Sequence, residues 1–264
     1  MNLDRIFLSE SHPCGKELRY VQHALEAKAI TSGGDVVRDF EEDLEYYLGN
    51  NVIVNATNSG TSAIHLGLLL LGVKPGDEVI CQSMTFSASV NPILYIGASP
   101  VFVDSELDTW NMCPIALEEA IQDRISKGKK PKCIIVVDLY GMPYHADRIN
   151  EVANKHGIAV LEDSAEALGS RYKGVPCGTL GDIGVFSFNG NKIITTSSGG
   201  ALLLSDASQK ERAAFLATQA RDAAPYYQHS EIGYNYAMSS IAAAVGRGQL
   251  EVLNSRIQSR RNNH

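Results

Sequence analysis

Residues 133–166 have the sequence CIIVVDLYGMPYHADRINEVANKHGIAVLEDSAE. Two short apolar runs, Cys133–Asp138 and Ile158–Glu162, lie on either side of a longer amphipathic segment, Ala146–His156. Apolar runs of strand length separated by a helix-length segment predict two parallel strands joined by a crossover helix. This unit therefore predicts an α/β protein with a mostly parallel sheet.

The same alternation continues on both sides of this unit. Further strands are predicted at Val52–Ala56, Glu78–Cys81, Pro100–Val103, Ile183–Phe188 and Ala201–Leu204. Helices are predicted between them at Ser62–Leu71, Ser87–Ile96, Ile115–Ile125 and Gln209–Gln219. Two more helices, near Lys16–Lys28 and Val36–Leu48, precede the sheet, and another begins at Ser239.

The composition limits what the protein can be. The chain has 264 residues, of which 44% are hydrophobic, and a formal net charge of -7 at pH 7. The negative charge argues against a protein that binds nucleic acid by neutralising phosphates. The longest apolar stretch, Ala63–Val73, is far shorter than the roughly 20 residues that span a bilayer, so we expect no membrane partner. The N-terminus lacks the features of a signal peptide, so we expect a cytoplasmic protein. The 5 cysteines and 7 histidines lack the spacings of a zinc site, so we expect reduced thiols and no metal.

Ligands of open α/β sheets bind beyond the carboxyl ends of the strands, and several polar clusters occur at such positions. The first cluster, Thr57–Ser62, separates a predicted strand from an apolar helix. Free backbone N–H groups at a helix start, hydroxyls and a glycine that permits close approach suit a phosphate group. Serine and threonine are also ordinary N-cap residues, so this cluster alone indicates either a phosphate site or a cap.

The second cluster, Ala159–Glu166, brings carboxylates to the carboxyl end of an apolar strand. An acid at this position could hold a cation, a ribose hydroxyl or the protonated nitrogen of a heteroaromatic cofactor. The alternative is that Asp163 caps the next turn of the chain.

The third cluster contains a lysine just past a buried strand, in Phe186–Lys192, and is followed by the turn Thr195–Gly200. Desolvation disfavours the charged form of such a lysine, which can then attack a carbonyl carbon and form a Schiff base. Ser187 would direct its hydroxyl toward the same crevice. Most lysines are exposed loop residues, and position alone favours that alternative for Lys192.

Two aromatic segments complete the set of candidates. The loop Gly233–Ser240 enters a helix and could reach a ligand or a partner subunit, although aromatic residues before a helix more often pack in the core. Phe86 could stack on a planar cofactor, and the alternative is again a core phenylalanine.

Taken in order, these clusters resemble the DegT family of sugar-nucleotide aminotransferases, which are fold-type I pyridoxal phosphate (PLP) enzymes. The resemblance runs from about Ile6 to the end of the chain and is most specific over Leu161–Gly200. That segment contains an Asp-x-Ala stretch, a Gly-Asp-x-Gly-x-Phe-Ser-Phe strand and a lysine in register. The resemblance implies a three-layer α/β/α large domain over residues 1–238, with 239–264 as the start of a small C-terminal domain that is largely absent.

The resemblance implies catalytic roles for two residues. Lys192 would hold the cofactor as a Schiff base and then move a proton between carbon atoms, and Asp163 would keep the ring nitrogen protonated. The implied activity is transfer of an amino group from an amino acid, which we take to be glutamate, to a keto-sugar nucleotide. The motifs around these two residues are most similar to those of enzymes that aminate C4 of a UDP-4-keto-6-deoxy-N-acetylhexosamine for surface glycans.

Other residues are implied to bind the cofactor. Phe86 would stack on the ring, and Glu166 would lie near the ring hydroxyl. Asn235 would reach the cofactor phosphate from the neighbouring subunit, which implies a homodimer with shared active sites. Within one subunit, the phosphate would be bound by Gly60, Thr61 and Ser187.

Two alternatives from other classes stay open on the sequence. Ala237 stands where the family motif usually continues with arginine, and the missing C-terminal part would help to close the substrate cleft. The chain could therefore be a catalytically silent PLP-binding or regulatory relative. A nicotinamide-dependent reductase would share the fold class, but this sequence lacks the glycine fingerprint of those enzymes.

Overall fold

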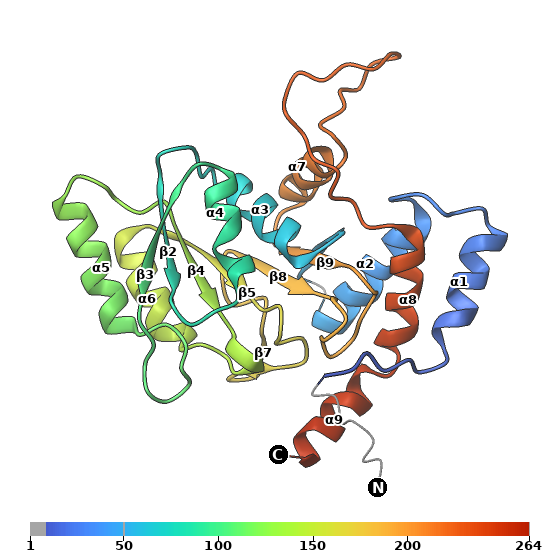
Figure 1. Cartoon of the computed structure of the whole chain (residues 1–264), viewed down its shortest axis with the longest axis horizontal. Coiled ribbons are helices and arrows are strands. Elements are labelled where there is room, and N and C mark those ends of the chain that lie inside the picture. Colours follow the sequence, from blue (N-terminus) through green and yellow to red (C-terminus); the bar gives the residue numbers. More distant parts are fainter. Residues whose placement is uncertain (1–8, 50, 264) are drawn as a thin grey trace, which may run out of the picture.

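A computed structural model describes residues 9–49 and 51–263, and at its centre is a seven-stranded sheet (Figure 1). Along the sheet the strands follow the order β1-β9-β8-β5-β4-β2-β3. β9 runs antiparallel to both of its neighbours, β1 and β8, and the other neighbouring strands of this sheet are parallel. The prediction of a mostly parallel sheet is confirmed. No strand end differs from its predicted position by more than one residue: β1 Ile53–Thr57, β2 Glu78–Gln82, β3 Ser99–Val103, β4 Cys133–Val137, β5 Ala159–Asp163, β8 Ile183–Ser187 and β9 Gly200–Leu204.

Helices cover both faces of the sheet and form the predicted three-layer α/β/α arrangement (Figure 1). One face packs against α3, α4 and α7, and the other against α5, α6 and α2, while α8 lies on α2 and α1 on α8. In the described ranges, no helix is both long and apolar enough to cross a membrane. The bounds are α1 Glu17–Glu26, α2 Asp35–Leu48, α3 Gly60–Leu70, α4 Asn91–Tyr95, α5 Pro114–Ser126, α6 Ala146–His156, α7 Ala207–Ala217 and α8 Ser240–Leu250.

The apolar composition of the strands follows from burial on both faces. In β2, Val79 and Cys81 pack with Leu66 of α3, whereas Ile80 joins Leu117 of α5 on the opposite face. Successive side chains of a strand point to opposite faces, so a strand between two helical layers needs apolar residues at nearly every position. This burial explains why the strands could be predicted as nearly uninterrupted apolar runs.

The prediction of one helix over Ser87–Ile96 is wrong. The segment forms a 3-10 turn, Ser87–Ser89, followed by the short helix α4. Pro92 lies in the first turn of α4 and has no N–H to donate, so one continuous helix cannot pass through this point. The sequence also gave no sign of a small hairpin, because its strands are only two residues long: β6 Arg171–Tyr172 and β7 Val175–Pro176.

The helix predicted from Ser239 onward is divided in the structure. α8 ends at Leu250, and α9 occupies Leu253–Asn263 (Figure 1). At the break, Glu251 accepts hydrogen bonds from Lys16 Nζ (2.9 Å) and from the Tyr20 hydroxyl (2.6 Å). These partners lie 235 and 231 positions away, so the local sequence pattern could not show the break. The predicted domain boundary at residue 238 stays a prediction.

The sheet topology brings the candidate clusters to one edge. Thr57 and Ser187, the last residues of β1 and β8, both pair with Gly200, the first residue of the reversed strand β9. Further along the same edge, Val137 at the end of β4 pairs with Asp163 at the end of β5. The polar segments that follow these strands therefore lie side by side.

Candidate active site

A cavity of about 490 Å³ opens at this edge of the sheet. Its walls come from the segments that follow β1, β2, β4, β5 and β8, together with the turn before β9. Asn235 is not among its lining residues in this chain. The other residues predicted from the sequence all line it: Gly60, Thr61, Phe86, Asp163, Glu166, Ser187 and Lys192.

One end of the cavity is the N-terminus of α3. The Ser59 hydroxyl oxygen accepts a hydrogen bond from the N–H of Ser62 (3.1 Å), so Ser59 is the N-cap of the helix. The cap does not use every donor. Within the described residues, the N–H groups of Gly60 and Thr61 have no acceptor. Free N–H groups at a helix start attract anions, so the cluster both caps the helix and offers an anion site.

Two glycines allow α3 to begin this close to the strands. A Cβ at Gly200 would come within 2.4 Å of the backbone nitrogen of Gly60, and a Cβ at Gly60 would come within 2.9 Å of Ser187 Cβ. Ser187 Oγ lies 3.3 Å from that same position, beside the free N–H groups. We call this space, bounded by Gly60, Thr61 and Ser187, the anion recess.

Replacing Gly60 with alanine should fill the anion recess. We expect overpacking against Ser187 to lower the free energy of unfolding by about 1–3 kcal/mol. Binding of a phosphate group should weaken by about tenfold or more, because the methyl group occupies the space beside the donors. Thermal unfolding and titration with inorganic phosphate measure these effects. Gly190→Ala is the matched control, since a Cβ there meets nothing within 4 Å. Equal losses in both variants would contradict the role of the recess.

Asp163 is a buried carboxylate at the cavity wall, with only 4% of its surface exposed. Ser89 donates its hydroxyl hydrogen to Oδ2 (2.6 Å), and the N–H of Ala165 donates to Oδ1 (3.2 Å). The second bond is the turn contact expected if Asp163 acts as a cap. Burial raises the pKa of the Asp163 carboxyl, against the smaller opposing effects of Ser89, Ala165 and the charge of Lys192. A ligand that brings a cation to Asp163 would restore the ionised form and is therefore favoured.

Lys192 lies in the turn after β8, and its ammonium group faces Glu166. Nζ is 3.3 Å from Glu166 Oε1, and only 16% of the lysine side chain is exposed, so Lys192 is not an ordinary surface lysine. The other carboxylate oxygen of Glu166 accepts a hydrogen bond from the N–H of Tyr140 (2.9 Å). Tyr140, which the sequence did not single out, has a φ of 53°, a conformation that residues other than glycine rarely adopt. This conformation directs its N–H at Glu166.

The segment after β2 contributes two further side chains. Phe86 lines the cavity and is 78% exposed, so the alternative of a core phenylalanine is wrong. Ser89, the hydrogen-bond donor to Asp163, was not predicted, and it lies 74 positions away from its partner. Its signal in the sequence is the hydroxyl-rich run Ser83–Ser89 directly after a predicted strand.

The aromatic loop packs against α3 and is not part of the cavity lining. Tyr234 and Tyr236 contact the ring of His65, and the Tyr236 hydroxyl lies 3.1 Å from His65 Nδ1. Burial lowers the pKa of His65 to about 4, so this histidine is neutral at pH 7. Asn235, between the two tyrosines, has an exposed side chain, and its carbonyl oxygen accepts a hydrogen bond from Asn58 Nδ2 (2.9 Å).

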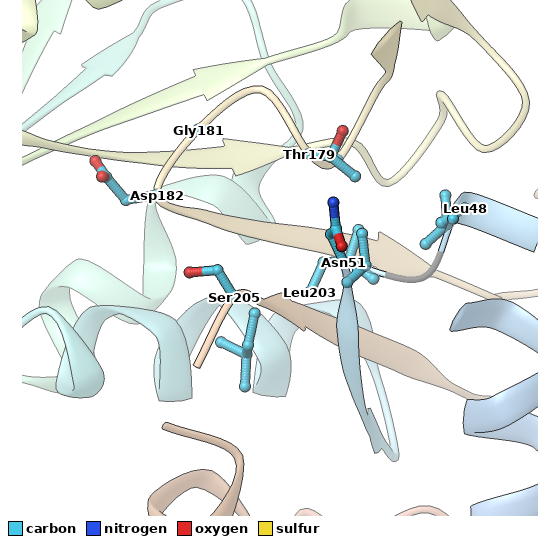
Figure 2. Close-up of a pocket in the computed structure, with 11 residues that line it drawn as sticks. Leu48, Asn51, Thr179, Gly181, Asp182, Leu203 and Ser205 are labelled. Atoms are coloured by element: carbon cyan, nitrogen blue, oxygen red, sulfur yellow. The ribbon is translucent and has the colours of Figure 1, made fainter. Parts of the chain in front are cut away.

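A second pocket, of about 320 Å³, lies at the opposite end of the sheet (Figure 2). It is bounded by the end of α2, the start of β1, the end of β9 and the loop before β8. None of the predicted site residues lines it, so the cavity at the carboxyl ends of the strands is the candidate active site. The residues labelled in Figure 2 are Leu48, Asn51, Thr179, Gly181, Asp182, Leu203 and Ser205.

Comparison with known proteins identifies the family. A model of the DegT/DnrJ/EryC1/StrS aminotransferase family matches residues 14–264. The chain belongs to this family. The predicted resemblance to the DegT aminotransferases is thus confirmed, and we drop the hypothesis of a nicotinamide-dependent reductase.

Individual DegT relatives match nearly the whole chain. The "Putative pyridoxal phosphate-dependent aminotransferase EpsN" of Bacillus subtilis (strain 168) is 51% identical over 97% of this chain and 66% of its own length. The GDP-perosamine synthase of Escherichia coli O157:H7 is 42% identical over 94% of this chain and 66% of its own length. The structure of "Putative sugar aminotransferase Spr1654 from Streptococcus pneumoniae, PMP-form" has a TM-score of 0.90 at 30% identity. The match includes 98% of this chain and 70% of that structure. The chain therefore spans about two thirds of the length of the curated DegT relatives that it matches.

Proposed function

We propose that this DegT-family chain is a PLP-dependent aminotransferase. The observation that carries the proposal is that one cavity joins the anion recess, a buried carboxylate and a poorly exposed lysine. The recess suits a phosphate group, and Asp163, whose pKa is raised by burial, suits a cationic ring nitrogen. The residues present therefore fit PLP, which carries both groups together with an aldehyde for Lys192.

Each of the residues in the cavity would have its own role toward the cofactor. PLP, when bound, supplies an electron-accepting ring that stabilises negative charge on a substrate carbon. Asp163 would hold the proton on the ring nitrogen, and the exposed ring of Phe86 would cover one face of the site. Lys192 would bind the aldehyde carbon through Nζ and, once a donor amine has displaced it, would move a proton between carbon atoms. Glu166 would keep Nζ near the reacting atoms, because it lies 3.3 Å from that atom and is itself held by Tyr140.

The acceptor that we propose is a keto-sugar nucleotide, with glutamate as the amine donor. Support comes from relatives whose names include a sugar aminotransferase and a GDP-perosamine synthase. The motifs around Asp163 and Lys192 favour amination at C4 of a UDP-4-keto-6-deoxy-N-acetylhexosamine. The name of the GDP-perosamine synthase makes a GDP-linked keto sugar the second acceptor to test.

We also propose that two copies of the chain share their active sites. Adjacent residues of an extended segment point to opposite sides. Since Tyr234 and Tyr236 pack on His65, Asn235 is directed away from its own core, where it is available to a second copy. The loop before Asn235 projects far beyond α7 in Figure 1 and carries exposed apolar side chains that a partner could cover: Tyr226, Tyr227 and Ile232.

Transfer of an isotopically labelled amino group from glutamate tests the proposed function. With PLP and UDP-4-keto-6-deoxy-N-acetylglucosamine, the chain should form a labelled amino sugar nucleotide, detected by mass spectrometry. A GDP-linked 4-keto sugar and a chain extended to the length of the relatives are tested in parallel. If PLP binds but neither chain aminates either acceptor, the silent relative is favoured. If PLP does not bind, the cofactor proposal is contradicted.

A further inference from the structure

Two buried carboxyl groups, those of Asp138 and Glu162, lie behind the active site and have no role in the function proposed above. Asp138 follows β4, Glu162 lies in β5, and Ser164 follows β5 directly after Asp163. The side chains of Asp138, Glu162 and Ser164 are completely buried. Neighbouring residues of a strand point to opposite faces, so Glu162 points toward the layer of α5 and α6 while Asp163 faces the cavity.

Glu162 is surrounded by backbone donors. Its Oε1 accepts a hydrogen bond from the N–H of Gly178 (2.6 Å), and its Oε2 accepts bonds from the N–H groups of Leu180 (2.7 Å) and Gly181 (3.1 Å). Several such bonds favour the charged form of a carboxyl group. The donors belong to the loop that forms one wall of the second pocket, where Figure 2 labels Thr179 and Gly181. Glu162 thus has the surroundings of a carboxylate ion.

Asp138 accepts fewer hydrogen bonds from the backbone than Glu162 does, and it shares a serine hydroxyl with Glu162. Its Oδ1 accepts a hydrogen bond from the N–H of Tyr144 (3.1 Å), and its Oδ2 lies 2.5 Å from the hydroxyl oxygen of Ser164. The same hydroxyl oxygen lies 3.1 Å from Oε1 of Glu162. One serine hydroxyl has a single hydrogen and can donate it to only one of the two carboxyl groups. The other contact therefore needs a hydrogen of its own.

Among the described residues, no basic side chain balances the charge of the two carboxyl groups. In the described part of the chain, neither Asp138 nor Glu162 forms an ion pair with a basic side chain, and the titratable groups that face them are the Cys177 thiol and the Tyr144 phenol. One carboxylate oxygen of Asp138, one of Glu162 and the Sγ atom of Cys177 all lie within 4.8 Å of one another. Two buried negative charges at such a separation would repel each other strongly. Burial and the charge of Glu162 raise the pKa of Asp138 well above its ordinary value.

We propose that Asp138 and Glu162 share one proton, which resides on Asp138, and that the pair positions Asp163. Asp138 Oδ2 then donates to Ser164 Oγ, and the Ser164 hydroxyl donates to Glu162 Oε1. This chain of bonds holds both sequence neighbours of Asp163, and the N–H of Asp138 donates to the Asp163 carbonyl oxygen (3.1 Å). The positioning role rests on the proposed function of Asp163, whereas the location of the proton does not.

Two isosteric amide variants test which carboxyl group carries the proton. Asp138→Asn keeps a donor for Ser164 and has no proton to lose, so we expect the variant to unfold no more readily than the wild type at neutral pH. Glu162→Gln replaces an acceptor by a donor that faces backbone N–H groups, so we expect unfolding to become about tenfold or more favourable. Urea unfolding followed by circular dichroism measures both. A tolerated Glu162→Gln together with a destabilising Asp138→Asn would overturn the assignment.

The proton can also be observed directly. A protonated carboxylic acid has its own C=O stretching band, and the infrared difference spectrum of the wild type minus Asp138→Asn at neutral pH should contain such a band, whether or not other carboxyl groups are protonated. Native Asp138 would keep a proton that the unfolded chain has lost above about pH 4. The stability of the wild type relative to Asp138→Asn should therefore fall as pH rises from about 5, by tenfold in the unfolding equilibrium constant per pH unit, until the native group ionises. No band, or a difference that does not change with pH, would overturn the proposal. The proposal would also be overturned if the purified wild type contained one equivalent of a divalent metal that Asp138→Asn lacks.

Cofactor binding tests the positioning role separately. We expect Asp138→Ala, which removes the donor to Ser164, to weaken PLP binding by about tenfold in an absorbance titration, and Asp138→Asn to restore it. Wild-type affinity in both variants would overturn the positioning role and leave the proton assignment intact. If the wild type itself does not bind PLP, the proposed function and the positioning role fail together, while the infrared and unfolding results still decide where the proton resides.

Discussion

Replacing Lys192 with alanine should abolish amine transfer and leave the protein folded. The variant has no amine to bind the aldehyde of PLP and no base at this position to move a proton, so we expect turnover to fall by at least about 10³-fold. Stability should change little. The ion pair of Lys192 with Glu166 spans 3.3 Å and its two side chains are 16% and 32% exposed, and partly exposed pairs contribute about 0–1 kcal/mol.

Borohydride reduction distinguishes the role of Lys192 from a general loss of activity. After incubation with PLP and reduction, wild-type protein should gain the mass of the reduced cofactor, and peptide mapping should place the added mass on Lys192. The matched control is Lys127→Ala, because Lys127 is an exposed lysine that pairs with Asp123 in α5 (2.8 Å), and this variant should be labelled like the wild type. Labelling that persists in Lys192→Ala would show that another lysine binds the cofactor.

The strands could be predicted because their signal is local. Each residue of β4, such as Ile134 or Ile135, is apolar because helices cover both faces of the sheet, and this burial needs no knowledge of the strand order. The division between α8 and α9 has a different origin. It coincides with contacts from Glu251 to Lys16 and Tyr20 at the other end of the chain, and no local pattern encodes such contacts.

The candidate site could be predicted only in part, for a related reason. Parallel strands deliver their carboxyl ends to one edge, so Asp163 and Lys192 could be expected in one crevice. Which side chains touch them depends on the order of strands across the sheet. The bond from Ser89 to Asp163 requires the segment after β2 to reach the end of β5, although β4 lies between these strands. The alternation of strands and helices along the sequence does not specify that order.

Replacing Asp163 with asparagine should have opposite effects on stability and on function. Burial raises the pKa of native Asp163, so the native protein without cofactor retains a proton on this group that the unfolded chain has lost. The contribution of Asp163 to stability is fully present below about pH 4 and is lost as pH rises through the raised pKa. The cofactor-free variant, which lacks this titration, should therefore gain stability relative to the wild type between about pH 5 and pH 8. The gain is about 1.4 kcal/mol for each unit by which the native pKa is raised.

Function should change in the opposite direction because the neutral amide cannot hold a proton on the ring nitrogen of PLP. We expect Asp163→Asn to lower turnover by about 10²–10⁴-fold and to weaken PLP binding, while its melting temperature without cofactor equals or exceeds that of the wild type at pH 8. Asp182→Asn is the matched control. Asp182 lies at the opposite end of the sheet, where its carboxylate accepts a hydrogen bond from the N–H of Val160 (2.7 Å), so its replacement should leave PLP binding unchanged. A variant at Asp163 that loses both stability and activity at every pH would mean that the carboxylate serves the fold and not the cofactor. Unchanged activity would show that no ring nitrogen lies against Asp163.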